Sequence, residues 1–322
     1  MSSSRTSAAG AAAFVSRFYT SHDGLKLHYR DYPGPPNPRL TVICIPGLTR
    51  NARDFEDVAP HLADRYRVLC VELRGRGQSE YAKDPMTYVP PVYVRDIIAL
   101  MNSAGLMRAA LIGTSLGGII SMVLAAVIPH RLLGVVINDI GPELDPVGLA
   151  RIGSYVGRSK PVRTWEEAAA AIQAIDGVVF PEYKAEDWAR MARRRFIEAP
   201  EGGLRANYDL SISQPFIANA KAVDLWPFFT SLRMMPVLAI RGANTDLLSP
   251  AVFDRMQAEV PHLQRVTVPN RGHAPYLDEP EARGAIDKFL DSLPAVIGPG
   301  TAMKRRLASL ALLLRLKLKG AI

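Results

Sequence analysis

The residue best placed by its neighbours to act as a nucleophile is Ser115. It lies at the centre of Gly113-Thr114-Ser115-Leu116-Gly117, which matches the pattern G-x-S-x-G. The apolar residues ALI precede this pattern and GGIISMVLAAVI follows it, so a strand is predicted before the serine and a helix after it. Small neighbours allow the tight strand-to-helix turn that presents a serine hydroxyl at the end of a strand. Because such a hydroxyl attacks acyl carbonyls, the pattern predicts acyl-transfer chemistry.

A serine hydroxyl is a weak nucleophile at neutral pH and needs a general base. His273 lies in PNRGHAPYLDEP, just after a predicted strand, and is therefore expected at the same sheet edge as Ser115. The base in turn needs a carboxylate that fixes its tautomer and stabilises the imidazolium. We prefer Asp246, which follows the apolar run PVLAIRG. The alternative is Asp139 after LLGVVIN, because the chain order serine, acid, histidine admits both, and Asp209 is a more distant candidate.

Two backbone N–H groups are expected to stabilise the oxyanion that forms when the serine attacks. One belongs to Leu116, the residue after the nucleophile. The other is expected in the loop after the apolar run LTVICIPG, at Leu48, where Gly47 would let the backbone approach the substrate oxygen closely.

The elements that must position these residues alternate between strand and helix. Six apolar runs without polar alternation are typical of parallel strands covered on both faces: 40–47, 67–73, 110–115, 132–139, 236–242 and 264–270. Helical segments separate the early runs, so a doubly wound, mostly parallel α/β sheet is predicted. Residues 18–32 contain Asp23-Gly24 between two alternating runs, which predicts a β-hairpin. With its two strands, the sheet is expected to have eight.

We expect the strand–helix alternation to be interrupted by a helical cap at 141–230, lying over the carboxyl edge of the sheet. Residues 164–167 form a capping box that opens an Ala-rich helix, and a second helix is predicted at 182–198 with Arg190, Arg193, Arg194 and Arg195 on its exposed side. The expected organisation is then a flexible leader at 1–16, a core formed by 17–140 and 231–295, the cap, and a basic Leu-rich tail at 296–322.

The charge is concentrated in that tail. The formal net charge of the 322 residues is +8, and the last 22 residues contribute Lys304, Arg305, Arg306, Arg315, Lys317 and Lys319 with no acid. The remainder therefore carries +8 − 6 = +2, which argues against a nucleic-acid-binding body. The segment 303–319 could make a weak peripheral contact with an anionic membrane, dock on the domain, or form a partly ordered tail.

The cysteines and histidines indicate neither a disulfide framework nor a metal site. Cys44 and Cys70 lie inside apolar runs and are expected to be reduced core thiols, as is usual in a reducing compartment. The six histidines are scattered without metal-ligand spacing, and we expect no cofactor. The N-terminal residues lack the apolar stretch of a secretory signal, so the predicted location is the cytoplasm.

Together these motifs resemble the α/β-hydrolase superfamily, and within it the cap-bearing esterase and lactonase-like bacterial hydrolases. The resemblance covers residues 18–293 and rests on six segments in the right order: 45–55, 72–79, 113–118, 138–145, 241–249 and 271–280. It implies that Ser115, Asp246 and His273 are nucleophile, acid and base, and that Leu48 and Leu116 donate to the oxyanion. The serine itself excludes relatives that use an aspartate nucleophile.

The resemblance implies a serine esterase that cleaves a small-molecule carboxylic ester through an acyl-enzyme, with water as second substrate. An enol-lactonase or a carbon–carbon bond hydrolase of aromatic degradation is the alternative enzyme, and Arg50 and Arg53 are available to bind the anionic substrates usual there. A small-molecule receptor is the alternative outside enzymes, because fold does not fix function. Candidate pocket walls, most of them expected to be core, are Tyr155, Phe180, Phe216, Trp226 and Phe228.

Overall fold

An eight-stranded sheet forms the centre of the computed structural model, which describes residues 13–218 and 223–318. The order of its strands is β1-β2-β4-β3-β5-β6-β9-β10. The hairpin predicted around Asp23-Gly24 is present, and its second strand pairs antiparallel with β4, whereas all later pairings are parallel. The strands are β1 (Val15–Thr20), β2 (Lys26–Tyr32), β3 (Thr41–Ile45), β4 (Arg67–Val71), β5 (Ala109–Thr114), β6 (Leu132–Asn138), β9 (Val237–Gly242) and β10 (Gln264–Val268). The predicted fold class is confirmed.

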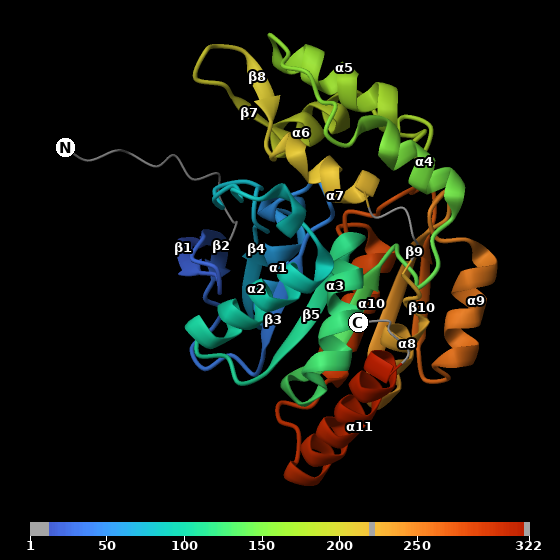
Figure 1. The fold of residues 1–322 in the computed structure, drawn as a ribbon. Helices are drawn as coiled ribbons and strands as arrows, with labels where there is room; N and C mark the ends of the chain where they lie inside the picture. The colour runs from blue at the N-terminus through green and yellow to red at the C-terminus, as the bar shows by residue number, and fades with distance from the viewer. Residues whose placement is uncertain (1–12, 219–222, 319–322) are drawn as a thin grey trace.

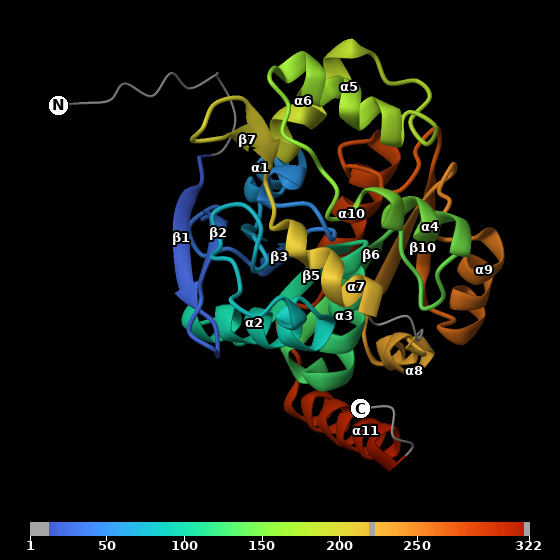
Figure 2. The same cartoon turned by 45° about the horizontal axis from the view of Figure 1, so that its top comes forward.

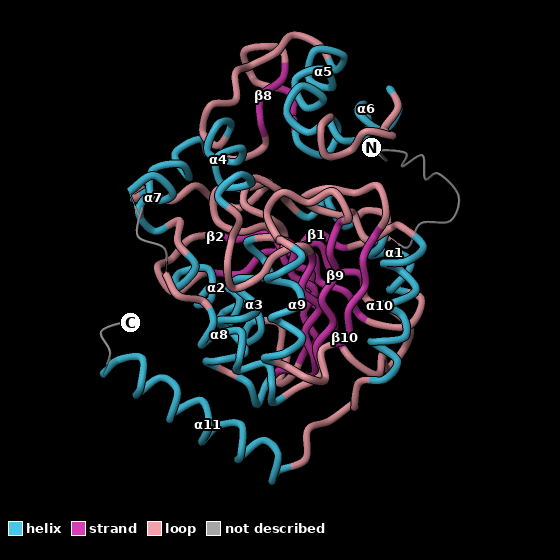
Figure 3. Tube along the Cα trace, turned by 90° about the vertical axis from the view of Figure 1, so that its right-hand side faces the viewer, coloured by secondary structure: helices cyan, strands magenta, loops and turns pink. Residues whose placement is uncertain are grey.

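Both faces of the central strands are covered, which explains their continuous apolar runs. Every residue of β3, β5, β6 and β9 is buried. Along β3, Ile43 and Ile45 pack with α2 (Pro90–Ser103) and α3 (Leu116–Val127), while Val42 and Cys44 face α1 (Val58–Ala63) and α10 (Pro280–Ser292). Figure 3 shows the strands between these two helical layers. Successive side chains of a strand point to opposite faces, so each face receives its own apolar set.

Helix α3 approaches the sheet too closely for a side chain at Gly117. A Cβ built at this glycine would lie 2.1 Å from the carbonyl oxygen of Ile45 in β3. The glycine therefore sets the depth at which the helix that follows Ser115 packs on the sheet.

We expect Gly117→Ala to lower the free energy of unfolding by about 1–3 kcal/mol, because backbone must move to admit the methyl group. Gly284→Ala is the matched control, since this glycine lies in α10 and a Cβ there has nothing within 4 Å. The free energy of unfolding of that control should rise by roughly 0.5–1 kcal/mol, as usual for Gly to Ala in a helix interior. Urea unfolding followed by circular dichroism measures both, and equal effects of the two substitutions would contradict the close approach.

The segment between β6 and β9 forms a cover above the carboxyl ends of the strands (Figures 1 and 2). It contains α4 (Pro146–Tyr155), α5 (Trp165–Asp176), α6 (Ala185–Arg195), α7 (Ser213–Ala218) and a small hairpin of β7 (Phe196–Glu198) and β8 (Leu204–Ala206), which was not expected. Helices α5 and α6 share a small core that includes Ile172, Phe180 and Trp188.

The structure differs from the expected organisation at the end of the cover and at the start of the chain. Helix α8 (Trp226–Thr230), expected in the cap, packs on α3, with Phe228 and Phe229 in the main core. Of the expected leader, residues 1–12 lie outside the described residues, and β1 already begins at Val15. Phe216 also belongs to the residues whose side chains are not described.

The remaining helices are α9 (Pro250–Glu259), between β9 and β10 in the chain, and α11 (Pro299–Leu318). Helix α11 contacts α3 and the short turn η3 (Pro129–Arg131), and it lies at the opposite end of the molecule from the cover (Figures 1 and 2). Among residues 13–218 and 223–318, no helix combines the length and the apolar character needed to cross a bilayer.

Candidate active site

Ser115 sits at the junction of β5 and α3, as predicted. Its φ of 54° and ψ of −117° lie outside the regions that ordinary residues prefer, which is the strain expected of a sharp strand-to-helix turn. Tight packing around the turn accounts for the flanking glycines, because a Cβ at Gly113 would lie 2.2 Å from the carbonyl oxygen of Gly117. The serine hydroxyl is thus presented at the carboxyl edge of the sheet.

Ser115 belongs to a chain of hydrogen bonds with His273 and Asp139. The Oγ of Ser115 lies 2.8 Å from Nε2 of His273, and Nδ1 of the same ring lies 2.9 Å from Oδ2 of Asp139. Asp139 is fully buried and His273 is buried. Because an ionised carboxylate only accepts, Nδ1 carries the ring proton and Nε2 is left to accept the proton of the serine. This arrangement can activate a serine nucleophile.

Asp139 is fixed by the backbone around it. It directly follows β6, and its φ of 56° turns the chain at the end of the strand. Its Oδ1 accepts a hydrogen bond of 2.8 Å from the N–H of Gly242, at the end of the neighbouring strand β9. Next to it, Asn138 donates 2.8 Å to the carbonyl of Pro275 and so ties the loop of His273 to β6. The end of β6 therefore positions both the acid and the base.

The structure places Asp139, and not the preferred Asp246, in hydrogen-bond contact with His273. The carboxylate of Asp246 accepts hydrogen bonds of 2.5 and 2.9 Å from Nε and Nη2 of Arg151 in α4. Burial opposes ionisation of Asp246, but these bonds and the charge of Arg151 outweigh it, so the pKa lies below its usual range. The more distant candidate Asp209 accepts from the hydroxyl of Tyr88 at 2.6 Å. The alternative in the sequence, Asp139, is the carboxylate that meets the histidine.

The two expected oxyanion donors lie on either side of the nucleophile. Leu116 is the first residue of α3, where backbone N–H groups have no partner within the helix. Leu48 lines the pocket that contains Ser115 and His273. A Cβ at Gly47 would stand 3.5 Å from Cβ of Ser115, so a side chain there would enter the space above the nucleophile. The donor roles of Leu48 and Leu116 stay a prediction.

Arg76 holds the loop of Leu48 and was not singled out in the sequence. Its guanidinium is fully buried, and Nε donates a hydrogen bond of 2.9 Å to the carbonyl of Leu48. Nη1 donates to the hydroxyl of Tyr93 at 3.0 Å, and the ring of Tyr88 packs against the guanidinium. The signal in the sequence is RGRG at 74–77, which lies within the segment 72–79 that carries part of the resemblance. Arg76 is a positioning residue for this loop.

The pocket above Ser115 has a polar wall opposite the catalytic edge. Arg50, Asp176 and Tyr155 line it, and Arg50 donates 2.5 Å to the hydroxyl of Tyr276, another lining residue. Burial opposes the charge of Asp176, but Arg195, Arg50 and Arg151 together hold its pKa below the usual range. The wall therefore combines the guanidinium of Arg50 with the ionised carboxylate of Asp176, which Arg151 and Arg195 contact from outside the pocket lining.

The arginines of α6 correct a sequence prediction. Arg190 and Arg193 are exposed as expected, but Arg194 is buried and pairs with Asp57. Arg195 donates 2.6 Å to Asp176 and 3.1 Å to the hydroxyl of Tyr276. Helical periodicity placed the four together, whereas the cover folds the last two inward against the core domain. Arg53, the second candidate for anion binding, pairs with Glu56 at 2.9 Å outside the pocket lining.

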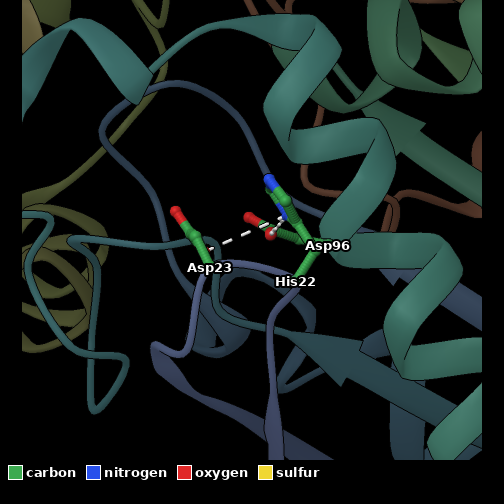
Figure 4. Close-up of side chains that lie close together, drawn as sticks. All are labelled: His22, Asp23 and Asp96. Carbon is green, nitrogen blue, oxygen red and sulfur yellow. Dashed lines mark ion pairs between the residues drawn. The ribbon is translucent and has the colours of Figure 1, made fainter.

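A separate group of possible metal ligands has a structural role. Potential ligand atoms of His22, Asp23 and Asp96 lie within 4.8 Å of one another (Figure 4). The buried guanidinium of Arg74 donates to both carboxylates at 2.7–2.9 Å. Because Arg74 already supplies the compensating positive charge, we assign these carboxylates to an ion-pair network that fastens the β1–β2 turn to α2.

Comparisons with known proteins show what this chain is similar to. The model of a family described as alpha/beta hydrolase fold matches residues 41–280. The 3-hydroxybutyrate-oligomer hydrolase of Cupriavidus necator is 36% identical over 267 residues, which is 79% of this chain and 89% of that protein. The 2-(acetamidomethylene)succinate hydrolase of Mesorhizobium japonicum is 30% identical over 76% of this chain and 86% of its own length. The crystal structure of an alpha/beta hydrolase from Novosphingobium aromaticivorans superposes with a TM-score of 0.83 at 46% identity, covering 88% of this chain and 99% of that one.

Proposed function

Since this chain belongs to the alpha/beta hydrolase fold family, we propose that it is a serine hydrolase that cleaves carboxylic esters through an acyl-enzyme. One observation carries the proposal: a hydrogen-bonded chain runs from Ser115 through His273 to the buried Asp139 and opens on a pocket. The three side chains come from three different places in the sheet: Ser115 follows β5, Asp139 follows β6, and His273 lies in the loop after β10. The fold thus brings them together from distant parts of the chain, as a shared catalytic role requires.

The proposed reaction has two halves. Nε2 of His273 accepts the hydroxyl proton while Oγ of Ser115 bonds to the ester carbonyl, and the N–H groups of Leu48 and Leu116 stabilise the oxyanion. The imidazolium, stabilised by Asp139, then gives its proton to the leaving alkoxide, and the acyl-enzyme remains. Water repeats the sequence with His273 as base, releasing the acid and restoring the serine.

The substrate we propose is a short oligoester of a hydroxy acid, whose free end is a carboxylate. The relative from Cupriavidus necator is named for hydrolysis of 3-hydroxybutyrate oligomers. Within the described residues, the side-chain hydrogen bonds of Arg50 all use Nη1, which leaves Nε and Nη2 available to a substrate anion. A guanidinium binds a carboxylate through two parallel hydrogen bonds and so could orient such a substrate.

We expect the protein to hydrolyse both the linear dimer of 3-hydroxybutyrate and p-nitrophenyl butyrate, which has no carboxylate. Arg50→Gln should raise KM for the dimer about tenfold to a hundredfold, since hydrogen bonds to charged groups contribute roughly 1.5–3 kcal/mol. KM for the neutral ester should change little. Arg53→Gln is the matched control, because Arg53 lies close in sequence but pairs with Glu56 outside the pocket lining.

Steady-state kinetics on the two substrates separates the outcomes. Wild type without turnover of either ester would contradict the ester-hydrolase proposal and favour a receptor role for the same pocket. Equal increases of KM on both substrates in Arg50→Gln would contradict carboxylate recognition while leaving ester hydrolysis intact.

A second candidate is hydrolysis of an anionic substrate that is not a simple ester. The relative from Mesorhizobium japonicum is named for 2-(acetamidomethylene)succinate, a dicarboxylate. The arginines that surround Asp176 at the pocket wall favour such a substrate as well. Turnover of 2-(acetamidomethylene)succinate, whose acetamido group offers an acyl bond to the serine, in place of the butyrate esters would select this function.

A further inference from the structure

Helix α11 is attached to the domain along one face. The guanidinium of Arg305 is buried and donates hydrogen bonds of 3.1 and 2.8 Å to the carbonyls of Pro129 and Leu132. The hydroxyl of Ser309 donates 2.6 Å to the carbonyl of Ala126 at the end of α3. Two helical turns beyond Ser309, Leu316 is buried in the main core. These contacts fix the orientation of the helix about its own axis.

The opposite face of α11 is an apolar stripe. We define this stripe by four residues whose exposed fractions lie between 57% and 61%: Met303, Leu307, Leu310 and Leu314. Their spacing of four, three and four positions keeps them on one side of a helix with 3.6 residues per turn. Arg305, Ser309 and Leu316 fall on the other side. Monomeric proteins usually expose apolar side chains singly, so a continuous outward row calls for a partner.

Basic side chains border the stripe along both of its edges. At 100° per residue, Lys304 and Arg315 lie on one edge, and Arg306 and Lys317 on the other. All four are exposed. No aspartate or glutamate occurs after Asp291 in the sequence. The outward half of α11 is therefore an apolar row between two positive rows.

We propose that this face of α11 docks on the surface of an anionic phospholipid membrane. An apolar stripe flanked by Lys and Arg is the chemistry that lets a helix lie in the plane of a bilayer, with the stripe among the acyl chains and the cations at the headgroup phosphates. A second copy of the chain fits less well, because two such faces would bring their basic rows together. An anionic surface instead neutralises both rows while it covers the leucines.

The position of α11 determines how the docked protein would face its substrate. The helix contacts the carboxyl end of α3 and η3, next to the start of β6, whereas Ser115 precedes the first residue of α3. The cover lies at the end of the molecule opposite to α11 (Figure 1). The pocket that contains Ser115 therefore lies at the end of the domain away from the membrane. A docked enzyme would therefore take its substrate from the aqueous phase. Helix α11 also lies outside the residues 41–280 that the family model matches. The membrane contact is thus separable from catalysis.

The test is co-sedimentation of the full chain with vesicles of phosphatidylcholine alone or of phosphatidylcholine mixed equally with phosphatidylglycerol. Wild type should bind the phosphatidylglycerol vesicles, and binding should weaken as salt is raised, because screening shortens the reach of the charges. Replacing one basic residue of the rows by glutamine should lower partitioning about fivefold, the equivalent of about 1 kcal/mol per charge. In the triple variant Leu307→Ser, Leu310→Ser, Leu314→Ser, partitioning onto these vesicles should fall at least tenfold.

The control carries three apolar residues from elsewhere on the surface that are more exposed than the three leucines, replaced in the same way: Met107→Ser, Val178→Ser and Val296→Ser. It should bind as wild type does. Circular dichroism shows that each variant retains its helices, and light scattering after gel filtration gives the oligomeric state. Wild type that ignores phosphatidylglycerol, a leucine triple variant that binds like wild type, or a wild-type dimer that this triple variant converts to monomers would each overturn the proposal.

Discussion

Replacing Ser115 by alanine is expected to lower kcat for ester hydrolysis by about four to six orders of magnitude, the range seen when the nucleophile of such a triad is removed. The hydroxyl is held 2.8 Å from Nε2 of His273, and the proposed acyl-enzyme forms on its oxygen. What remains in the variant should be the small acceleration that binding and the oxyanion donors provide to direct attack by water. Substrate binding should be nearly unchanged, because alanine removes one partly buried oxygen and fills the same turn.

The measurement is a pre-steady-state burst of p-nitrophenol from p-nitrophenyl butyrate, followed by the steady rate. Ser103→Ala is the matched control, since Ser103 ends α2 on the exposed surface. It should keep both the burst and the steady rate of wild type. A Ser115→Ala variant that retains a burst would show that another residue carries the acyl group, and the proposed mechanism would then be wrong.

Asp139→Asn is expected to have the second largest effect, a fall in kcat of about four orders of magnitude. An asparagine can offer its amide N–H to Nδ1, which would stabilise the ring tautomer with the proton on Nε2. That tautomer cannot accept the proton of Ser115. Asparagine also withdraws the negative charge that stabilises the imidazolium during the reaction. The geometry can survive, because Oδ1 can still accept from the N–H of Gly242.

Asp246→Asn is the paired comparison, and it should leave kcat within about tenfold of wild type. Its carboxylate is engaged by Arg151, so the substitution weakens the contact between α4 and the loop after β9 without altering the partner of His273. Stopped-flow or steady-state kinetics on the same neutral ester decides between the two carboxylates. If Asp246→Asn proved the more damaging substitution, the acid assignment drawn from the hydrogen bond of 2.9 Å would have to be reversed.

Several features could be predicted because they depend on local chemistry. The continuous apolar runs predicted buried parallel strands, and G-x-S-x-G between a strand and a helix predicted the turn that presents Ser115. His273 was expected at the same sheet edge because it follows a strand, and the structure brings its ring to the serine. Periodicity and turn residues are properties of neighbouring positions, so they need no knowledge of distant contacts.

The choice of acid needed the tertiary structure. Asp139 and Asp246 both follow strands that are neighbours in the sheet, β6 and β9, and both stand between serine and histidine in the chain. The sequence alone therefore determined that a carboxylate would reach this edge, but not which one. Arg151, 95 residues away from Asp246, binds that carboxylate, while Asp139 meets the histidine. A pairing over that separation leaves no periodic signal in the sequence.

Burial and orientation of helical residues were decided in the same way. The sequence determined that α6 is rich in arginine and that α11 is basic and rich in leucine. Only packing determined that Arg194 and Arg195 turn inward, where they form ion pairs with Asp57 and Asp176 respectively. Likewise, the hydrogen bonds of Arg305 and Ser309 decide which side of α11 meets the domain, and thereby which leucines remain exposed. Local sequence sets the helix, and contacts between distant segments set the face that it presents.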